Sequence, residues 1–79
     1  MERTVASNSY QELIDWLIEG RISRGWSIRD LAFQLKTPPN TVHRIETLER
    51  RLDVNEYVIY CRTLDLDPAD GINRFYEIK

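Results

Sequence analysis

The sequence predicts an all-α fold, a single five-helix bundle, and three observations support that prediction. Helix-capping signals recur along the chain, and apolar residues return at helical spacing between them. No stretch alternates apolar and polar residues for long enough to form a strand. With 79 residues, 42% of them hydrophobic and 30% charged, residues 1–79 have the composition of one ordinary globular domain.

The first helix is expected over residues 10–24. Ser9 and Glu12 have the spacing of a capping box, in which each side chain accepts a hydrogen bond from a backbone N–H at the helix start. Gly25 provides the left-handed residue that closes many helices. The residues before this start signal, 1–8, are expected to be frayed. The apolar stripe of the helix comprises Leu13, Ile14, Leu17 and Ile18.

The second and third helices are expected over residues 28–36 and 39–47. Ser27 begins the second helix, with an acidic residue three positions later in the capping pattern. Pro39 suits the first position of the third helix, where a missing N–H costs nothing, and it holds the residue before it extended. Two short helices joined by so tight a turn are the outline of a helix-turn-helix.

The fourth and fifth helices are expected over residues 54–64 and 68–76, because Asp53 and Asp67 each precede an acidic residue by three positions. Cys61 is the only cysteine and lies in an apolar run, which favours a buried small hydrophobe. With one cysteine, one histidine and no motif for nucleophilic or phosphate chemistry, we expect no enzyme activity, no metal and no cofactor.

Charge is segregated along the chain although the whole chain carries only −2. Residues 1–20 and 52–79 each sum to −3, whereas residues 21–51 sum to +4. Such segregation can present one basic face to a polyanion while the total charge stays low. No apolar run approaches the length of a membrane span and no signal pattern opens the chain, so we expect a cytoplasmic protein that does not enter a membrane.

The predicted third helix has two chemically different faces. Val42 and Ile45 point toward the core, whereas the other side chains point out: Asn40, Thr41, His43 and Arg44. The outward set suits the base edges of the major groove, since asparagine pairs with adenine, arginine with guanine, and a threonine methyl meets the thymine methyl. A short helix with such a face predicts double-stranded DNA as the partner.

Residues 13–72 resemble the lambda-repressor-like family, also called the Cro/repressor or XRE family, of helix-turn-helix proteins. The most specific elements are Leu31-Ala32, the run Thr41-Val42 and Arg44-Ile45-Glu46, and the spacing from Arg21 to Gly25. The resemblance implies a five-helix lambda-repressor-like bundle. It also implies an Arg21–Glu46 ion pair. Its implied base contacts are Pro39, Asn40, Thr41, His43 and Arg44. Its implied phosphate contacts are Ser27, Ile28, Arg29, Arg50 and Arg51.

The chain departs from the family pattern at four positions. Ile28 stands where glutamine is frequent and so removes a side-chain phosphate contact, and Pro39 can offer a base only apolar contact. Lys36 and Leu48 stand where glycine is frequent, so each needs either a different backbone shape or a strained positive φ. These departures affect which bases are read and leave the predicted fold intact.

Several large apolar residues have no obvious place in the small core. They either wrap the core or form a self-association surface, as a symmetric dimer on a palindromic operator requires. We expect a homodimer through the last two helices, with Gly71 allowing the close approach of the partner. The residues predicted for that interface are Ile59, Tyr60, Ile72, Phe75 and Tyr76.

The function predicted from the sequence is sequence-specific DNA binding that regulates transcription, with repression where the site overlaps a promoter. One alternative is an antitoxin or a restriction-modification controller, which binds DNA and also a protein partner of unknown identity. The other is a protein-interaction adaptor that has lost DNA binding, which the net negative charge, Ile28 and Pro39 favour.

Overall fold

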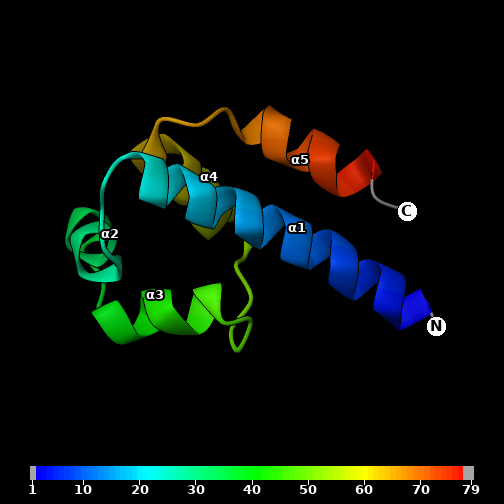
Figure 1. Ribbon diagram of the computed structural model, residues 1–79, viewed down its shortest axis with the longest axis horizontal. Helices are drawn as coiled ribbons and strands as arrows, with labels where there is room; N and C mark the ends of the chain where they lie inside the picture. The colour runs from blue at the N-terminus through cyan, green and yellow to red at the C-terminus, as the bar shows by residue number, and fades with distance from the viewer. Residues whose placement is uncertain (1, 78–79) are drawn as a thin grey trace.

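The computed structural model describes residues 2–77, and every regular element in that range is an α-helix (Figure 1). In Figure 1, α3 and the loop after it lie along the lower edge, α5 lies along the upper edge, and α1 crosses between them. None of the helices in the described range has the length and apolar character needed to cross a membrane. The helices are α1 (Glu2–Ser23), α2 (Ile28–Leu35), α3 (Pro39–Glu46), α4 (Val54–Leu64) and α5 (Pro68–Glu77).

The start of α1 differs from the prediction. The helix begins at Glu2 and not at residue 10, so residues 2–8, expected to be frayed, are helical; Met1 lies outside the described residues. Ser9 therefore sits buried inside the helix and does not begin it. The residues before Ser9 include no proline or glycine, so nothing in the chain stops the helix from continuing beyond the capping pattern.

The end of α1 is closed by Gly25, as predicted. Gly25 has a φ of 76°, and its N–H donates to the carbonyl of Ile22 at 2.8 Å. The N–H of Trp26 donates to the carbonyl of Arg21 at 3.2 Å, which completes a Schellman motif. This turn places Trp26 half-buried against the core, directly ahead of α2.

Two of the predicted capping boxes are present. The Ser27 hydroxyl accepts from the N–H of Asp30 at 3.1 Å, and the Asp30 carboxylate accepts from the N–H of Ser27 at 2.9 Å. Asp53 and Glu56 exchange the same pair of bonds at the start of α4. At α5, the Asp67 carboxylate accepts from the N–H of Ala69 at 3.0 Å. Asp67 thus caps α5 through the N–H two residues on, whereas a capping box would use the N–H three residues on.

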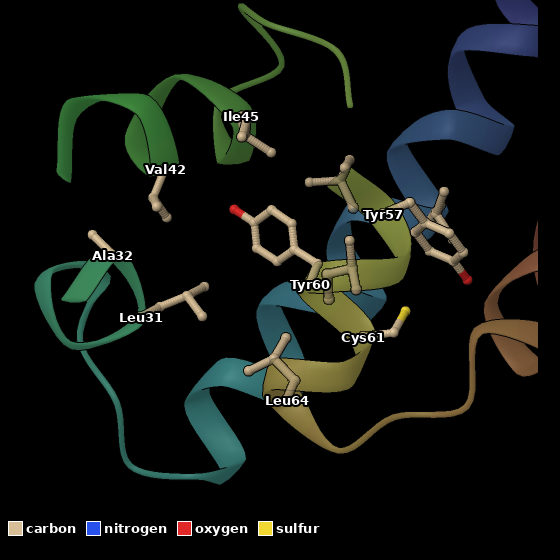
Figure 2. Close-up of a cluster of buried hydrophobic side chains, with 11 residues drawn as sticks. Leu31, Ala32, Val42, Ile45, Tyr57, Tyr60, Cys61 and Leu64 are labelled. Carbon is tan, nitrogen blue, oxygen red and sulfur yellow. The ribbon is translucent and has the colours of Figure 1, made fainter. Parts of the chain in front are cut away.

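The core lies where α1, α2, α3 and α4 meet, and Figure 2 shows its side chains converging from these helices. Leu31, Val42 and Cys61 are fully buried, so the cysteine behaves as the small hydrophobe that the sequence predicts. Burial raises the pKa of the Cys61 thiol, which keeps it protonated. The buried set is completed by Leu13, Ile14, Leu17, Ala32, Ile45, Tyr57, Tyr60 and Leu64.

Gly71 lets α5 approach the rest of this same chain and not a partner. It is buried, and a Cβ added there would overlap the Tyr57 hydroxyl and the Trp16 ring. The expectation that Gly71 serves a dimer contact is therefore wrong. The close approach seats α5 on α1 and α4, and it gives Trp16 a place beside the core.

Two core tyrosines on α4 differ in how their hydroxyls are satisfied. The Tyr57 hydroxyl donates to the carbonyl of Pro68 at 2.6 Å, which ties α4 to the start of α5. The Tyr60 hydroxyl is buried, has no hydrogen-bond partner among the described residues, and points toward α3 in Figure 2. Burial raises the pKa of both phenols, so both stay neutral at physiological pH.

Removing the two hydroxyls one at a time should therefore have different effects on stability. Tyr57→Phe should lower the free energy of unfolding by about 1 kcal/mol, because it removes the hydrogen bond that joins α4 to the start of α5. Tyr60→Phe, the matched control one turn away, should be neutral or stabilising, because the lost hydroxyl made no bond. Denaturant unfolding of both variants measures the difference. Equal losses would contradict the assignment of the two hydroxyls.

Candidate nucleic-acid interface

The turn between α2 and α3 depends on a left-handed lysine. Lys36 has a φ of 59°, and its N–H donates to the carbonyl of Phe33 at 3.1 Å. The N–H of Thr37 donates to the carbonyl of Ala32 at 3.0 Å. Extended Pro38 then leads directly into α3. The strained φ that the sequence allowed at Lys36 is thus what makes the helix-turn-helix turn this short.

The two faces of α3 are divided as the sequence predicts, except at Thr41. Val42 and Ile45 are buried, whereas the outward side chains Asn40, His43 and Arg44 are exposed. Thr41 is half-buried and lines a cavity of about 230 Å³ behind the helix, so its side chain is less available than those of its neighbours. Pro39, at the first turn, is exposed.

Arg44 is the longest donor on the exposed face of α3. Its Nε lies 3.9 Å from an Oε of Glu49, and both side chains are more than half exposed. An ion pair at this distance and exposure is weak and screened by salt. The guanidinium can therefore leave Glu49 for a stronger partner at little cost.

A second ion pair fixes the orientation of α3. The Arg21 guanidinium donates from Nε and Nη2 to the two carboxylate oxygens of Glu46, at 2.7 and 2.9 Å. Its Nη1 donates to the carbonyl of Trp26 at 2.8 Å. The two side chains are only 12% and 10% exposed. The pair that the family resemblance implies is therefore present, and Arg21 has no donor edge directed at solvent.

The start of α2 offers backbone donors. Ser27 and Asp30 satisfy each other in the capping box, which leaves the N–H groups of Ile28 and Arg29 without an intrahelical carbonyl. Arg29 is exposed beside them, whereas Ile28 packs against the core. Free amides and a basic side chain at a helix start form a site suited to phosphate.

Arg50, predicted as a phosphate contact, already forms an ion pair with Glu56. Its Nη1 and Nη2 donate to the two carboxylate oxygens of Glu56, at 3.2 and 2.6 Å. These bonds raise the pKa of Arg50, and together with the N–H of Asp53 they lower that of Glu56 below its usual range. The pair joins the loop to α4, so two N–H groups of the Arg50 guanidinium are already engaged.

Arg51, the next residue, is exposed, and its guanidinium carbon lies 4.8 Å from the centroid of the Tyr10 ring. The Tyr10 hydroxyl accepts from the N–H of Leu52 at 3.1 Å. These two contacts attach the loop after α3 to α1.

The comparisons with known proteins agree with this architecture. The helix-turn-helix family model matches residues 17–70. The chain belongs to the XRE-type helix-turn-helix family. A solved structure of an XRE-family like protein from Pseudomonas syringae pv. tomato str. DC3000 is 34% identical, with a TM-score of 0.87 over 96% of this chain and 95% of that chain. No curated protein matches.

The XRE-type helix-turn-helix is the fold of DNA-binding regulators, and it is not typically the fold of an enzyme. The segment of the match contains α2, the turn, α3 and the loop with Arg50 and Arg51. The residues predicted to contact bases or phosphates therefore all lie within the matched segment.

The predicted dimer residues do not form one surface. Tyr60 is 3% exposed and cannot contact a partner, so its assignment to an interface is wrong. Ile59 is exposed but lines the cavity behind α3. Ile72 and Phe75 line a separate apolar groove of about 490 Å³, together with Val54 at the start of α4. Tyr76 is exposed beside them on α5.

Sequence reasoning missed the partners of the loop. Glu56 is the acidic residue three positions after Asp53 in the capping pattern, but its carboxylate accepts both the Asp53 N–H and two N–H groups of Arg50. Tyr10 gave no local signal, because its contacts with Arg51 and Leu52 lie some forty residues away in sequence. The contact of Arg24 is equally distant in sequence, because it donates to the carbonyl of Leu64 at the end of α4.

Neutralising Glu46 should destabilise this XRE-type domain. Glu46→Gln leaves the nearly buried Arg21 without a counter-charge and should cost on the order of 3 kcal/mol. The double variant Arg21→Met, Glu46→Leu should recover much of that loss, because no charge is left unpaired. Denaturant unfolding at neutral pH measures both. A loss below 1 kcal/mol for Glu46→Gln would show that the pair is not important for the fold.

Proposed function

We propose that this chain binds a specific double-stranded DNA sequence by inserting α3 into the major groove, and that it regulates transcription, with repression where the site overlaps a promoter. The observation that supports this best is the division of α3. Its inner face is locked by Val42, Ile45 and the Arg21–Glu46 pair, while Asn40, His43 and Arg44 are exposed. A rigid helix with polar side chains on its outer face is the usual means of reading base edges.

The proposed division of labour places base reading on α3 and backbone contacts beside it. Asn40 suits adenine and Arg44 suits guanine, while Pro39 and Thr41 offer apolar contact. Phosphates would be held at the start of α2, by the N–H groups of Ile28 and Arg29 with the Ser27 hydroxyl, and by the loop after α3. A protein with this role would act in the cytoplasm, on the nucleoid.

Assembly as a homodimer on a palindromic operator is part of the proposal. Two domains related by a two-fold axis can place their α3 helices in successive major grooves, about 34 Å apart. The apolar groove supports this arrangement, because it is lined by Leu52 and Asp53, immediately after the loop that ends the helix-turn-helix, as well as by Ile72 and Phe75. A partner seated there would lie next to the DNA-binding elements without covering α3.

The same groove also fits an alternative function. A different protein could occupy it in place of a second copy, as in an antitoxin or a restriction-modification controller. Size measurement of the purified chain, alone and with its native neighbours co-expressed, separates these occupants. A homodimer that forms without any other protein supports the proposal, and an obligate heteromeric complex contradicts its dimer component.

A salt titration tests DNA binding itself. Binding of the wild type to a random duplex, followed by fluorescence anisotropy from 50 to 200 mM salt, should weaken steeply as released counterions are replaced. A protein-interaction adaptor of the same fold would show no binding. Absence of salt-dependent binding would therefore overturn the proposed function, whatever the oligomeric state.

Arg44 should read a base directly. Operator sites selected from random duplexes should lose about 1–3 kcal/mol of binding free energy with Arg44→Ala, while random DNA loses much less. Arg62→Ala, an exposed arginine on α4, is the matched control and should leave both unchanged. Equal losses on operator and random DNA would show that Arg44 contacts phosphate.

Phe75 should belong to the dimer interface. Phe75→Asp places a charge in the apolar groove and should yield monomers with reduced operator affinity and a retained helical spectrum. Ile22→Asp, a similar change at an exposed residue of α1 outside the groove, should remain dimeric. Sedimentation measures both. A wild type that is monomeric at tens of micromolar with operator present would contradict the dimer.

A further inference from the structure

The loop after α3 contains two neighbouring arginines whose guanidinium groups are engaged in different ways. A guanidinium has a flat face, which can stack on an aromatic ring, and an edge with five N–H donors, which can bind a carboxylate or a phosphate. Arg50 uses its edge, in the two bonds to Glu56. Arg51 uses its face, against the ring of Tyr10. This difference decides which of the two can bind DNA.

A phosphate can reach Arg50 only by displacing Glu56. That carboxylate also accepts the N–H of Asp53 in the capping box of α4, so moving it would disturb the start of the helix. Losing a bidentate, charge-assisted pair to gain another gives little net free energy. Arg50 thus closes the loop onto α4 and is a poor phosphate contact.

Arg51, in contrast to Arg50, is engaged through the flat face of its guanidinium. Its face is covered at 4.8 Å from the Tyr10 centroid, and no ion pair of Arg51 is found among the described residues. Its donor edge is therefore available, and the stack restricts the side chain before any ligand arrives. Ordering a long side chain in advance removes about 0.5–1.5 kcal/mol from the cost of binding, which is about a two- to ten-fold gain in affinity.

Tyr10 is itself held in place. It lies on α1, half-buried against the core, and its hydroxyl accepts from the N–H of Leu52 at 3.1 Å. One residue of the loop is thus bonded to the hydroxyl while its neighbour is stacked on the ring. The side chain acts as a fixed support between α1 and the loop.

We propose that Tyr10 is a positioning residue that presents the edge of Arg51 to a DNA phosphate, and that Arg51 alone provides the phosphate contact of this loop. The proposal rests on the function proposed above and assigns its loop contact to one of two adjacent arginines. It also gives α1, which lies outside the helix-turn-helix, a part in DNA binding.

The test is a double-mutant cycle read by binding to a random 25-base-pair duplex across a salt series. Arg51→Ala should weaken binding and lower the salt slope by about 0.9, the value of one phosphate contact. Tyr10→Leu should weaken binding about two- to ten-fold in the wild-type background. In the Arg51→Ala background it should have no effect. A structural role of Tyr10 would lower affinity equally in both backgrounds.

Three further variants keep the test decisive if Tyr10→Leu fails to fold. Tyr10→Phe keeps the ring and should retain most of the affinity. Arg51→Lys keeps the charge but loses the flat face, so it should keep the salt slope and still bind more weakly. Arg62→Ala removes the same charge elsewhere and should change neither quantity. A slope unaltered by Arg51→Ala, or a Tyr10→Leu effect that persists without Arg51, would overturn the inference. A wild type that binds no DNA would overturn the proposed function and this inference together.

Discussion

The orientation of α3 depends on the guanidinium of Arg21. Its donors reach both oxygens of Glu46, at the last turn of α3, and the carbonyl of Trp26, in the turn that leads to α2. One side chain on α1 is therefore bonded at both ends of the helix-turn-helix: just before α2 and in the last turn of α3. Because the pair is nearly buried, its interaction is little screened by water and its loss leaves a desolvated charge. The outer face of α3 can be polar and exposed because its position does not depend on that face.

Left-handed residues complete this framework. Lys36, Leu48 and Asp65 all have φ near 60° to 70° without being glycine, and each follows the end of a helix. Each costs about 1 kcal/mol or more relative to glycine, so the packing of the helices must hold them in place. Two of them bracket α3: Lys36 makes the turn before it short, and Leu48 lies at the start of the loop after it. The backbone strain is thus concentrated beside the helix that is proposed to contact DNA.

The sequence was informative wherever the signal was local. The capping boxes at Ser27 and Asp53 and the closing Gly25 gave the bounds of the helices between them to within a residue or two. The same pattern failed at Ser9, because a capping box marks a possible start and does not stop an upstream helix from continuing through it. Contacts between distant segments were not predictable. Nothing in two adjacent arginines indicates that one meets Glu56 and the other Tyr10.

The structure also changes what the charge of the central segment means. Residues 21–51 sum to +4, but Arg21 is neutralised by Glu46 within the segment, and Arg50 is neutralised by Glu56 from outside it. The positive charge available to DNA at this edge therefore comes from few side chains, chiefly Arg29, Arg44 and Arg51. Few phosphate contacts mean modest affinity for random DNA, since that term grows with each phosphate neutralised. With the function proposed here, discrimination would come from the bases that α3 reads and from the proposed pairing of two copies, and the net charge of −2 is consistent with that balance.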